Sequence, residues 1–242
     1  MQLHELDFDL GDAINFHDEL NTKLFEDNKL RPEVRKQLMV IADDFKEELE
    51  IPHSEVEDLT ISGSNAAYSY SKHSDLDLHL IVDIAALPNS ELQQKLFNAR
   101  KSLYNQSHDL KIRGIPVELY VQDSAQPHVS LGIYSVKNDE WIKEPVKTRA
   151  NLNQTATKAK YEKLKDLIEL AERARSLELV LNIMDTLKRY RKAGLTETGE
   201  FGPENLAFKV LRSQGYIDRL YDLRDELHSE RLSIESLETK VS

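Results

Sequence analysis

Hydrophobic residues first recur at helical spacing in the segment that follows Pro32. A proline fits the first turn of a helix because its missing N–H is not needed there. The apolar positions that share one face of this helix are Val34, Leu38, Ile41, Phe45 and Leu49. Acidic residues between 43 and 50 fall mostly on the other face, so the pattern predicts an amphipathic helix. A shorter helix is expected before it, over residues 13–24.

Strict alternation of apolar and polar residues then predicts a small mixed sheet over roughly residues 56–146. In the segment Leu76–Val82 every second residue is apolar, and Asp75, Asp77 and His79 point to the opposite face. A second alternating segment, residues 116–122, carries Glu118 on its polar face. The other elements expected in this region are strands over residues 59–61 and 130–136 and a helix over residues 87–104.

The rest of the chain has a helical pattern. Residues 157–193 contain neither proline nor glycine and repeat leucine at helical spacing, which predicts one long helix or two helices that separate near Ser176. Gly194 is expected to end this stretch, because glycine is the commonest residue just past a helix. The elements expected after it are a polar loop over residues 196–202, a helix from Pro203 to near Gly215, and a last helix over residues 217–232.

These patterns predict an α+β protein in which a small mixed β-sheet lies between helical parts. Residues 1–55 are expected to form an N-terminal helical segment that packs on the core. Residues 56–150 form the core that carries the candidate chemistry, and residues 151–242 form a C-terminal helical domain. A chain of 242 residues is long enough for one large domain or two small ones.

Composition excludes several classes of protein. Hydrophobic residues make up 40% of the chain and charged residues 31%, as in ordinary globular proteins. The absence of cysteine excludes disulfides, zinc–thiolate sites and a cysteine nucleophile. No apolar run approaches the roughly 20 residues that span a bilayer, and the N-terminus lacks the features of a signal peptide. A cytoplasmic location without membrane contact is therefore expected.

The net charge of −11 originates in the N-terminal quarter, where residues 1–60 contain 6 Lys and Arg against 17 Asp and Glu. Non-specific DNA binding is not expected, because it depends on Lys and Arg that contact phosphates. The clearest basic cluster comprises Lys188, Arg189, Arg191 and Lys192. Two roles stay open for this cluster: contact with a triphosphate or an RNA acceptor, and compensation of a helix dipole.

The candidate chemistry begins where the first predicted strand ends in Gly63-Ser64. Glycine lets the backbone approach a bound group closely, and the N–H groups that follow can face an anion. A helix that starts at Ala66 would add the positive end of its dipole. Ten residues after Ser64 come Asp75 and Asp77, whose carboxylates project from the same face of a strand.

Two carboxylates held side by side on an otherwise apolar strand repel each other unless a cation joins them. Oxygen ligands alone select a hard ion, so Mg²⁺ or Mn²⁺ is expected. Glu118 supplies a third carboxylate if its strand lies beside that of Asp77. Such a cluster can hold two ions, which activate an attacking hydroxyl and neutralise a triphosphate. Lys72 is close to the carboxylates in sequence and is either a phosphate contact or a solvated lysine.

This arrangement resembles the signature of the DNA polymerase β-like nucleotidyltransferase superfamily. Residues 61–64 supply its hydrophobic–Gly–Ser part, and residues 75–78 supply its Asp–hydrophobic–Asp–hydrophobic part, ten residues later. Glu118 matches the superfamily's third carboxylate, which lies on a later strand. In one departure, many small members place arginine soon after Gly–Ser, where this chain has Asn65. The departure removes no metal ligand.

The flanking segments 30–35 and 199–208 are similar to parts of uncharacterised nucleotidyltransferases common in bacteriophage genomes. With them, the resemblance covers most of the chain. A phage origin would place the protein in the host cytoplasm.

The resemblance implies transfer of a nucleoside monophosphate from an NTP, such as ATP, to an acceptor hydroxyl, with release of pyrophosphate. It implies that Asp75 and Asp77 bridge two metal ions, that Glu118 binds the catalytic one, and that Gly63 and Ser64 hold the β- and γ-phosphates. The acceptor is an RNA 3′ end, a protein or a small molecule. Two alternatives stay open: a non-catalytic module that binds nucleotide or RNA, and a regulator that AMPylates a protein hydroxyl.

Several other residues have both a structural and a functional interpretation. His79 follows the aspartates on the same face and is expected to be structural rather than a ligand. Tyr68 and Tyr70 are expected to pack rather than to stack on a base. Asn205 and Lys209, one helical turn apart beyond the glycine-rich loop, have no assigned role beyond a conceivable approach to a nucleotide.

Overall fold

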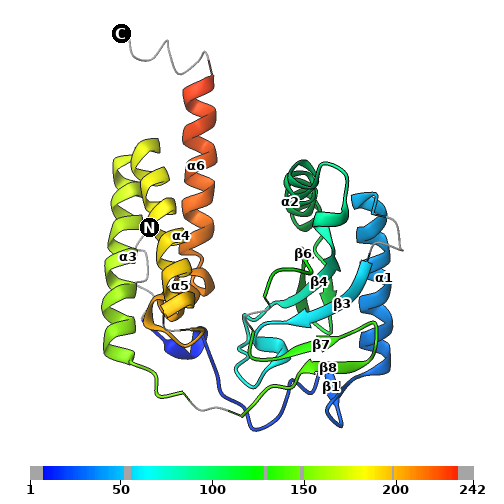
Figure 1. Cartoon of the computed structure of the whole chain (residues 1–242). Coiled ribbons are helices and arrows are strands. Elements are labelled where there is room, and N and C mark those ends of the chain that lie inside the picture. The colour runs from blue at the N-terminus through cyan, green and yellow to red at the C-terminus, as the bar shows by residue number, and fades with distance from the viewer. Residues whose placement is uncertain (1–7, 52–55, 128–129, 148–149, 198, 234–242) are drawn as a thin grey trace. The chain divides into compact units, whose positions relative to one another are not determined.

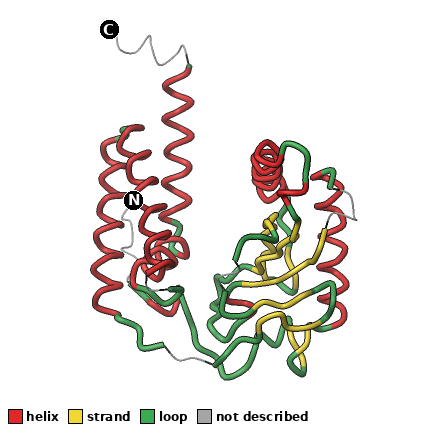
Figure 2. The backbone as a smooth tube through the Cα atoms, in the orientation of Figure 1, coloured by secondary structure: helices red, strands yellow, loops and turns green. Residues whose placement is uncertain are grey.

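The computed structural model describes residues 8–51, 56–127, 130–147, 150–197 and 199–233, and it confirms the α+β class (Figures 1 and 2). The helices are α1 (Pro32–Leu49), α2 (Ser90–Ser107), α3 (Gln154–Ala174), α4 (Leu177–Glu197), α5 (Pro203–Ser213) and α6 (Tyr216–Leu232). The strands are β1 (Phe25–Glu26), β2 (Lys29–Leu30), β3 (Val56–Ser62), β4 (Leu76–Val82), β5 (Lys111–Ile112), β6 (Ile115–Asp123), β7 (Ile133–Ser135) and β8 (Glu140–Lys143). The strands expected from alternation are confirmed.

Six of the strands form one mixed sheet in the order β5-β6-β4-β3-β7-β8, and β1 pairs with β2 in a separate hairpin. Within the large sheet β4 and β6 are parallel, and the other neighbouring pairs are antiparallel. The chain reaches β6 from β4 through helix α2, because parallel neighbours need a crossover connection. This crossover places two strands that are far apart in sequence side by side.

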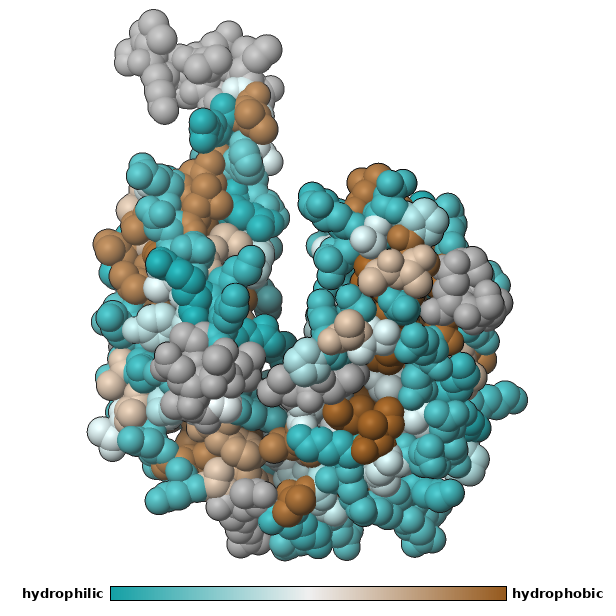
Figure 3. Space-filling model, viewed as in Figure 1, coloured by the Kyte–Doolittle hydropathy of each residue, from teal (hydrophilic) through white to brown (hydrophobic). Residues whose placement is uncertain are grey.

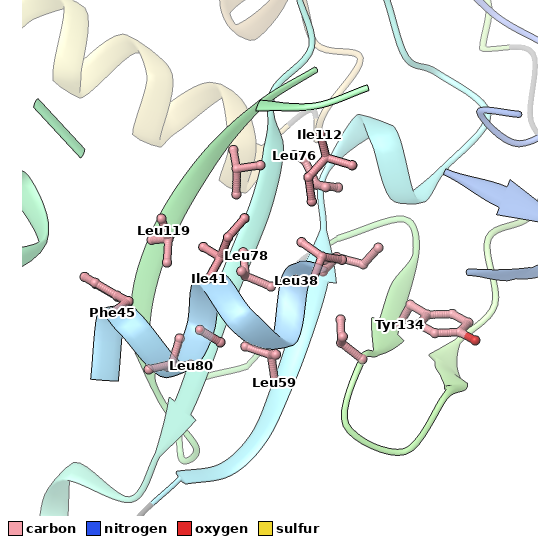
Figure 4. Close-up of a cluster of buried hydrophobic side chains, with 14 of the residues drawn as sticks. Leu38, Ile41, Phe45, Leu59, Leu76, Leu78, Leu80, Ile112, Leu119 and Tyr134 are labelled. Atoms are coloured by element: carbon pink, nitrogen blue, oxygen red, sulfur yellow. The ribbon is translucent and has the colours of Figure 1, made fainter. Parts of the chain in front are cut away.

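One face of the sheet is apolar and packs against helix α1 (Figure 4). Leu76, Leu78 and Leu80 of β4 are fully buried there, with Leu119 of β6 beside them. The side chains that α1 contributes to this core are the predicted set of Val34, Leu38, Ile41, Phe45 and Leu49. Each fully buried leucine contributes about 1.5–3 kcal/mol relative to an exposed one. Since strand side chains alternate, burial of these leucines turns the intervening residues of β4 to the opposite face.

Helix α1 begins at Pro32, as predicted, and ends where Glu50 adopts the left-handed conformation with φ of 57°. Helices α3 and α4 are separate, and Arg175 between them is also left-handed, with φ of 45°. The Arg175 guanidinium pairs with Glu226 and Glu230 of α6 at 3.1 and 2.6 Å. The predicted break near Ser176 is therefore confirmed, and its neighbour Arg175 connects the turn to the last helix.

The helix predicted over residues 13–24 is wrong. The structure has a three-residue 3₁₀ turn, Leu10–Asp12, followed by irregular chain. Asn21 shows the physical reason: its Oδ1 accepts the Lys23 N–H at 3.1 Å, and its Nδ2 donates to Asn65 at 2.8 Å. Asparagine side chains that bond nearby backbone compete with the helical hydrogen-bond pattern.

Gly194 does not end a helix, because α4 continues to Glu197. The residue is buried where α4 packs against α5, and a Cβ built on it would lie 2.7 Å from the Cβ of Glu204. Glycine is needed here for a close approach between helices, which the sequence pattern alone does not distinguish from a helix end.

The chain divides into two compact units, Asn15–Arg149 and Ala150–Ser242 together with Met1–Ile14. One division between the units thus lies between Arg149 and Ala150, and residues 1–55, which were expected to form one segment, are shared between the units. The stretch from Asn15 joins the sheet unit because α1 and the β1–β2 hairpin supply part of its core. Leu10–Asp12 instead contacts α5 of the helical unit.

Most of the visible surface is hydrophilic, with hydrophobic residues in small groups (Figure 3). In the described part of the chain, no helix is both long and apolar enough to cross a bilayer.

Candidate functional site

Asp77 and Glu118 are direct neighbours across β4 and β6. The two strands are parallel and in register at these positions, so both side chains project from the same face of the sheet. Each carboxylate alternates with buried leucines or valines of its own strand, and each is half-buried. The structure therefore brings together two acidic residues that are 41 positions apart in the sequence.

Asp75 lies one residue before β4 and is also half-buried. Its spacing of two from Asp77 is the spacing that keeps side chains on one face of a strand. Among the described residues, however, no group of three or more His, Asp and Glu side chains is arranged to hold a metal ion. The carboxylates of Asp77 and Glu118 thus form a pair by strand register, and Asp75 is not gathered with them into a three-ligand cluster.

Gly63 packs its backbone directly against the carboxylate of Asp77. Its φ of 78° lies in the region that favours glycine, and a Cβ added there would collide with Asp77 Oδ2. The Gly63 N–H donates to Ser130 Oγ at 3.1 Å. The Gly–Ser loop is therefore in contact with Asp77, and the Gly63 N–H already has a protein acceptor.

The α-helix expected from Ala66 is wrong, since only the 3₁₀ turn Ser64–Ala66 follows the glycine and Ala67 is extended. A turn this short carries no substantial helix dipole, so that part of the predicted anion site is lost. Ser64 does not cap a helix either: its hydroxyl donates to Ser74 Oγ at 2.7 Å. This bond joins the Gly–Ser loop to the residue that precedes Asp75.

Lys72 lies at the tip of a tight turn in which the Ser74 N–H donates to the Ser71 carbonyl at 3.1 Å. Its side chain is exposed. The turn is connected to the Gly–Ser loop through Ser74, whose Oγ accepts a hydrogen bond from the Ser64 hydroxyl at 2.7 Å.

His79 occupies the next position along the same polar face. It is the register partner of Tyr120, and their rings stack with centroids 4.9 Å apart. His79 Nε2 lies 3.1 Å from Ser62 Oγ, and Lys101 of α2 lies over the Tyr120 ring. These contacts give His79 a structural role, as expected.

Tyr68 and Tyr70 also have packing partners. Tyr68 packs against the sheet core, and Lys147 lies 5.4 Å from its ring centroid. Tyr70 stacks on His17 with ring centroids 3.7 Å apart, and burial raises the pKa of its hydroxyl. Both contacts agree with the packing interpretation.

The predicted basic cluster lies on α4, where Lys188, Arg189, Arg191 and Lys192 are all exposed. Arg189 pairs with Asp185 at 3.0 Å, and Arg191 lies over the ring of Phe208. Both contacts lie within the helical unit.

Asn205 and Lys209 both bind the loop that precedes α5. Asn205 Nδ2 donates to the Glu200 carbonyl at 2.7 Å, and Lys209 Nζ pairs with the Glu200 carboxylate at 3.2 Å. These two contacts fix the loop around Glu200, which explains why Asn205 and Lys209 are one helical turn apart.

The sequence analysis missed two asparagines that bind the backbone next to the candidate carboxylates. Asn65 is 1% exposed and donates to the carbonyls of Ser74 and Asp75. Asn105 of α2 bonds to both backbone groups of Leu119, which follows Glu118. The only signal in the sequence was that Asn65 replaces an expected arginine directly after Gly–Ser.

No family model matches the chain, and no curated protein or solved structure matches it.

Proposed function

We propose that the protein is a metal-dependent nucleotidyltransferase that transfers a nucleoside monophosphate from an NTP to an acceptor hydroxyl. The observation that carries the proposal is the register of Asp77 with Glu118, with Gly63 packed against the Asp77 carboxylate. Two adjacent half-buried carboxylates repel each other, and a shared cation removes that repulsion. Oxygen-only donors suit Mg²⁺ or Mn²⁺.

In this proposal Asp75, Asp77 and Glu118 hold the cation. The Asp75 carboxylate joins the other two when the cation binds. The bound ion would lower the pKa of the attacking hydroxyl and neutralise the triphosphate. Repulsion by the carboxylates of Asp77 and Glu118 is a physical reason for Asp75 to stay apart from them until a cation is present.

The protein's own groups have distinct roles in the transfer. Glu118 accepts the proton of the acceptor hydroxyl, whose oxygen forms a bond to the α-phosphorus. The bond from that phosphorus to the oxygen bridging to the β-phosphate breaks, and pyrophosphate leaves with the bonding electrons. Ser64 exchanges its hydrogen bond with Ser74 for one to a β- or γ-phosphate oxygen, beside Gly63. Lys72 contributes a positive charge near that end of the triphosphate.

The test is incubation of purified protein with Mg²⁺ or Mn²⁺ and each α-labelled NTP, with and without total RNA and cell extract. The Asp75→Ala/Asp77→Ala variant runs beside a control, Glu47→Ala/Glu48→Ala, which removes two exposed carboxylates from α1. We expect label in a macromolecule or small molecule with the wild type and the control, but not with the aspartate variant. The labelled fraction identifies the acceptor class. Absence of transfer, together with NTP binding that persists in the aspartate variant, would show a non-catalytic binding module.

A further inference from the structure

The Asn65 amide is fully engaged in buried hydrogen bonds. Its Nδ2 donates to the Ser74 carbonyl at 3.0 Å and to the Asp75 carbonyl at 2.8 Å. Its Oδ1 accepts from Asn21 Nδ2 at 2.8 Å. Both amide protons are used, and both go to the two consecutive residues at which the chain enters β4.

The two bonds donated by Asn65 lie where the chain enters β4, next to a candidate carboxylate. Asp75 lies one residue before β4, where its backbone precedes the first paired residue of the strand. The register with β6 begins at Leu76. The side chain of Asn65 therefore binds the backbone of a carboxylate-bearing residue that lies just before the register of β4 with β6 begins.

Asn105 has an equivalent relation to β6. Its Nδ2 donates to the Leu119 carbonyl at 2.9 Å, and its Oδ1 accepts the Leu119 N–H at 3.1 Å. The register of β6 with β5 ends at Pro116, and the Val117 N–H donates to the Leu110 carbonyl at 2.9 Å. Within the described residues, no strand pairs with the later part of β6 on the side away from β4. One amide on α2 thus substitutes for a neighbouring strand at the residue that follows Glu118.

We propose that Asn65 and Asn105 are positioning residues, which fix the backbone beneath Asp75 and Glu118 so that their carboxylates can share one cation. The inference rests on the proposed function, because it needs a cation at these carboxylates. Partners that orient metal ligands typically change metal affinity or activity 10–100-fold when they are removed. Neither asparagine touches the cation, so each acts only through the backbone of the neighbouring residue.

If Asn65 and Asn105 only stabilise the fold, any asparagine that contributes to stability should affect the site equally. Variants of two other asparagines therefore serve as controls. Asn21→Ala removes the third bond of Asn65 but leaves both donors to Ser74 and Asp75 in place. Asn153→Ala removes the N-cap of α3, whose side chain accepts the Ala156 N–H in the helical unit. Both controls should lower stability, by about 1 kcal/mol for a lost cap, without a change at the carboxylates.

The experiment measures Mn²⁺ binding by electron paramagnetic resonance titration of the full chain without nucleotide, and NTP transfer in parallel. The proteins are the wild type, Asn65→Ala, Asn105→Ala, both asparagine controls and Asp75→Ala/Asp77→Ala. Urea unfolding of each reports its stability. We expect Mn²⁺ affinity to fall at least tenfold in Asn65→Ala and Asn105→Ala and less than threefold in the controls.

Equal Mn²⁺ affinity in the wild type and the two positioning variants, with binding abolished in the aspartate variant, would overturn this inference and leave the proposed function intact. Equal binding by the wild type and the aspartate variant would overturn both. If Asn65→Ala does not fold, Asn105→Ala decides the matter, because it leaves the buried bonds of Asn65 in place. An affinity that falls in step with stability across all variants, controls included, would also count against the positioning role.

Discussion

Asp77 and Glu118 lie side by side as register partners on two parallel strands. Like charges directly opposite each other on neighbouring strands destabilise a sheet. We therefore expect the pair to lower the stability of the cation-free protein.

Replacing Glu118 with glutamine removes one charge and keeps the shape of the side chain. In EDTA and low salt, we expect the free energy of unfolding to rise by about 0.5 kcal/mol, the size of a cross-strand charge pair. Added Mg²⁺ should stabilise the wild type more than Glu118→Gln, because ligand binding to the folded state raises its stability. Urea unfolding with and without Mg²⁺ measures both effects. The control is Glu140→Gln on the edge strand β8, where register opposes the side chain to Ser135 and no carboxylate; a similar gain there would refute the explanation.

Gly63→Ala should be the most damaging small substitution in the loop. It combines a left-handed φ of 78° with a collision against Asp77 Oδ2. Gly114→Ala is a matched control, since Gly114 has φ of 81° and nothing within 4 Å of an added Cβ. We expect Gly114→Ala to cost about 1–2 kcal/mol, the backbone penalty alone.

The extra loss in Gly63→Ala then combines the contact with Asp77 and the cost of ψ −165°, which essentially only glycine adopts at positive φ. The double variant Gly63→Ala/Asp77→Ala should recover part of that loss but not the backbone penalty, which is a non-additive result for residues in contact. Equal losses in Gly63→Ala and Gly114→Ala in thermal unfolding would show that no such contact exists.

Tyr134 makes the sheet unit sensitive to alkaline pH. Its burial and its hydrogen bond to Asp139, 2.8 Å long, raise the pKa of the hydroxyl to about 12. Because the folded pKa lies above the unfolded value of 10.0, this stabilisation is fully present below pH 10 and is lost as pH rises toward 12. The free energy of unfolding that is lost over this pH range is roughly 2–3 kcal/mol.

Tyr134→Phe tests this dependence directly. We expect the variant to be about 1 kcal/mol less stable at neutral pH, where it lacks the hydrogen bond. Between pH 10 and 12 its stability should fall less steeply than that of the wild type. Unfolding by urea at a series of pH values measures the two slopes, and parallel slopes would contradict the prediction.

In Gly194→Ala, a gain in helix propensity opposes a steric clash between α4 and α5. Alanine is favoured over glycine by about 1 kcal/mol in an exposed helix interior. At Gly194 the new methyl group would lie 2.7 Å from the Cβ of Glu204, so α4 and α5 would have to move apart. We expect a net loss of about 1–3 kcal/mol, as for overpacking elsewhere. A gain in thermal stability would mean that the helices separate at little cost.

The sequence by itself determined the elements whose periodicity is strong. The apolar face of α1 and the alternation of β4 follow from local spacing, because each pattern reports which side chains must leave water. The same spacing left open whether α3 and α4 are one helix or two. The same alternation assigned Asp77 and Glu118 to the polar sides of their strands. Their role as metal ligands stays a prediction.

Only the tertiary structure decided which strands are neighbours and which polar groups meet. The parallel pairing of β4 with β6 joins residues 41 positions apart, and no local pattern encodes that register. Asn21 and Asn65 look like ordinary polar residues in the sequence, yet their mutual hydrogen bond helps to replace a predicted helix with an irregular segment. Gly194 was interpreted as a helix end because close packing against Glu204 leaves no trace in the local sequence. In each case the deciding interaction is made between segments that are distant along the chain, so it exists only once the chain has folded.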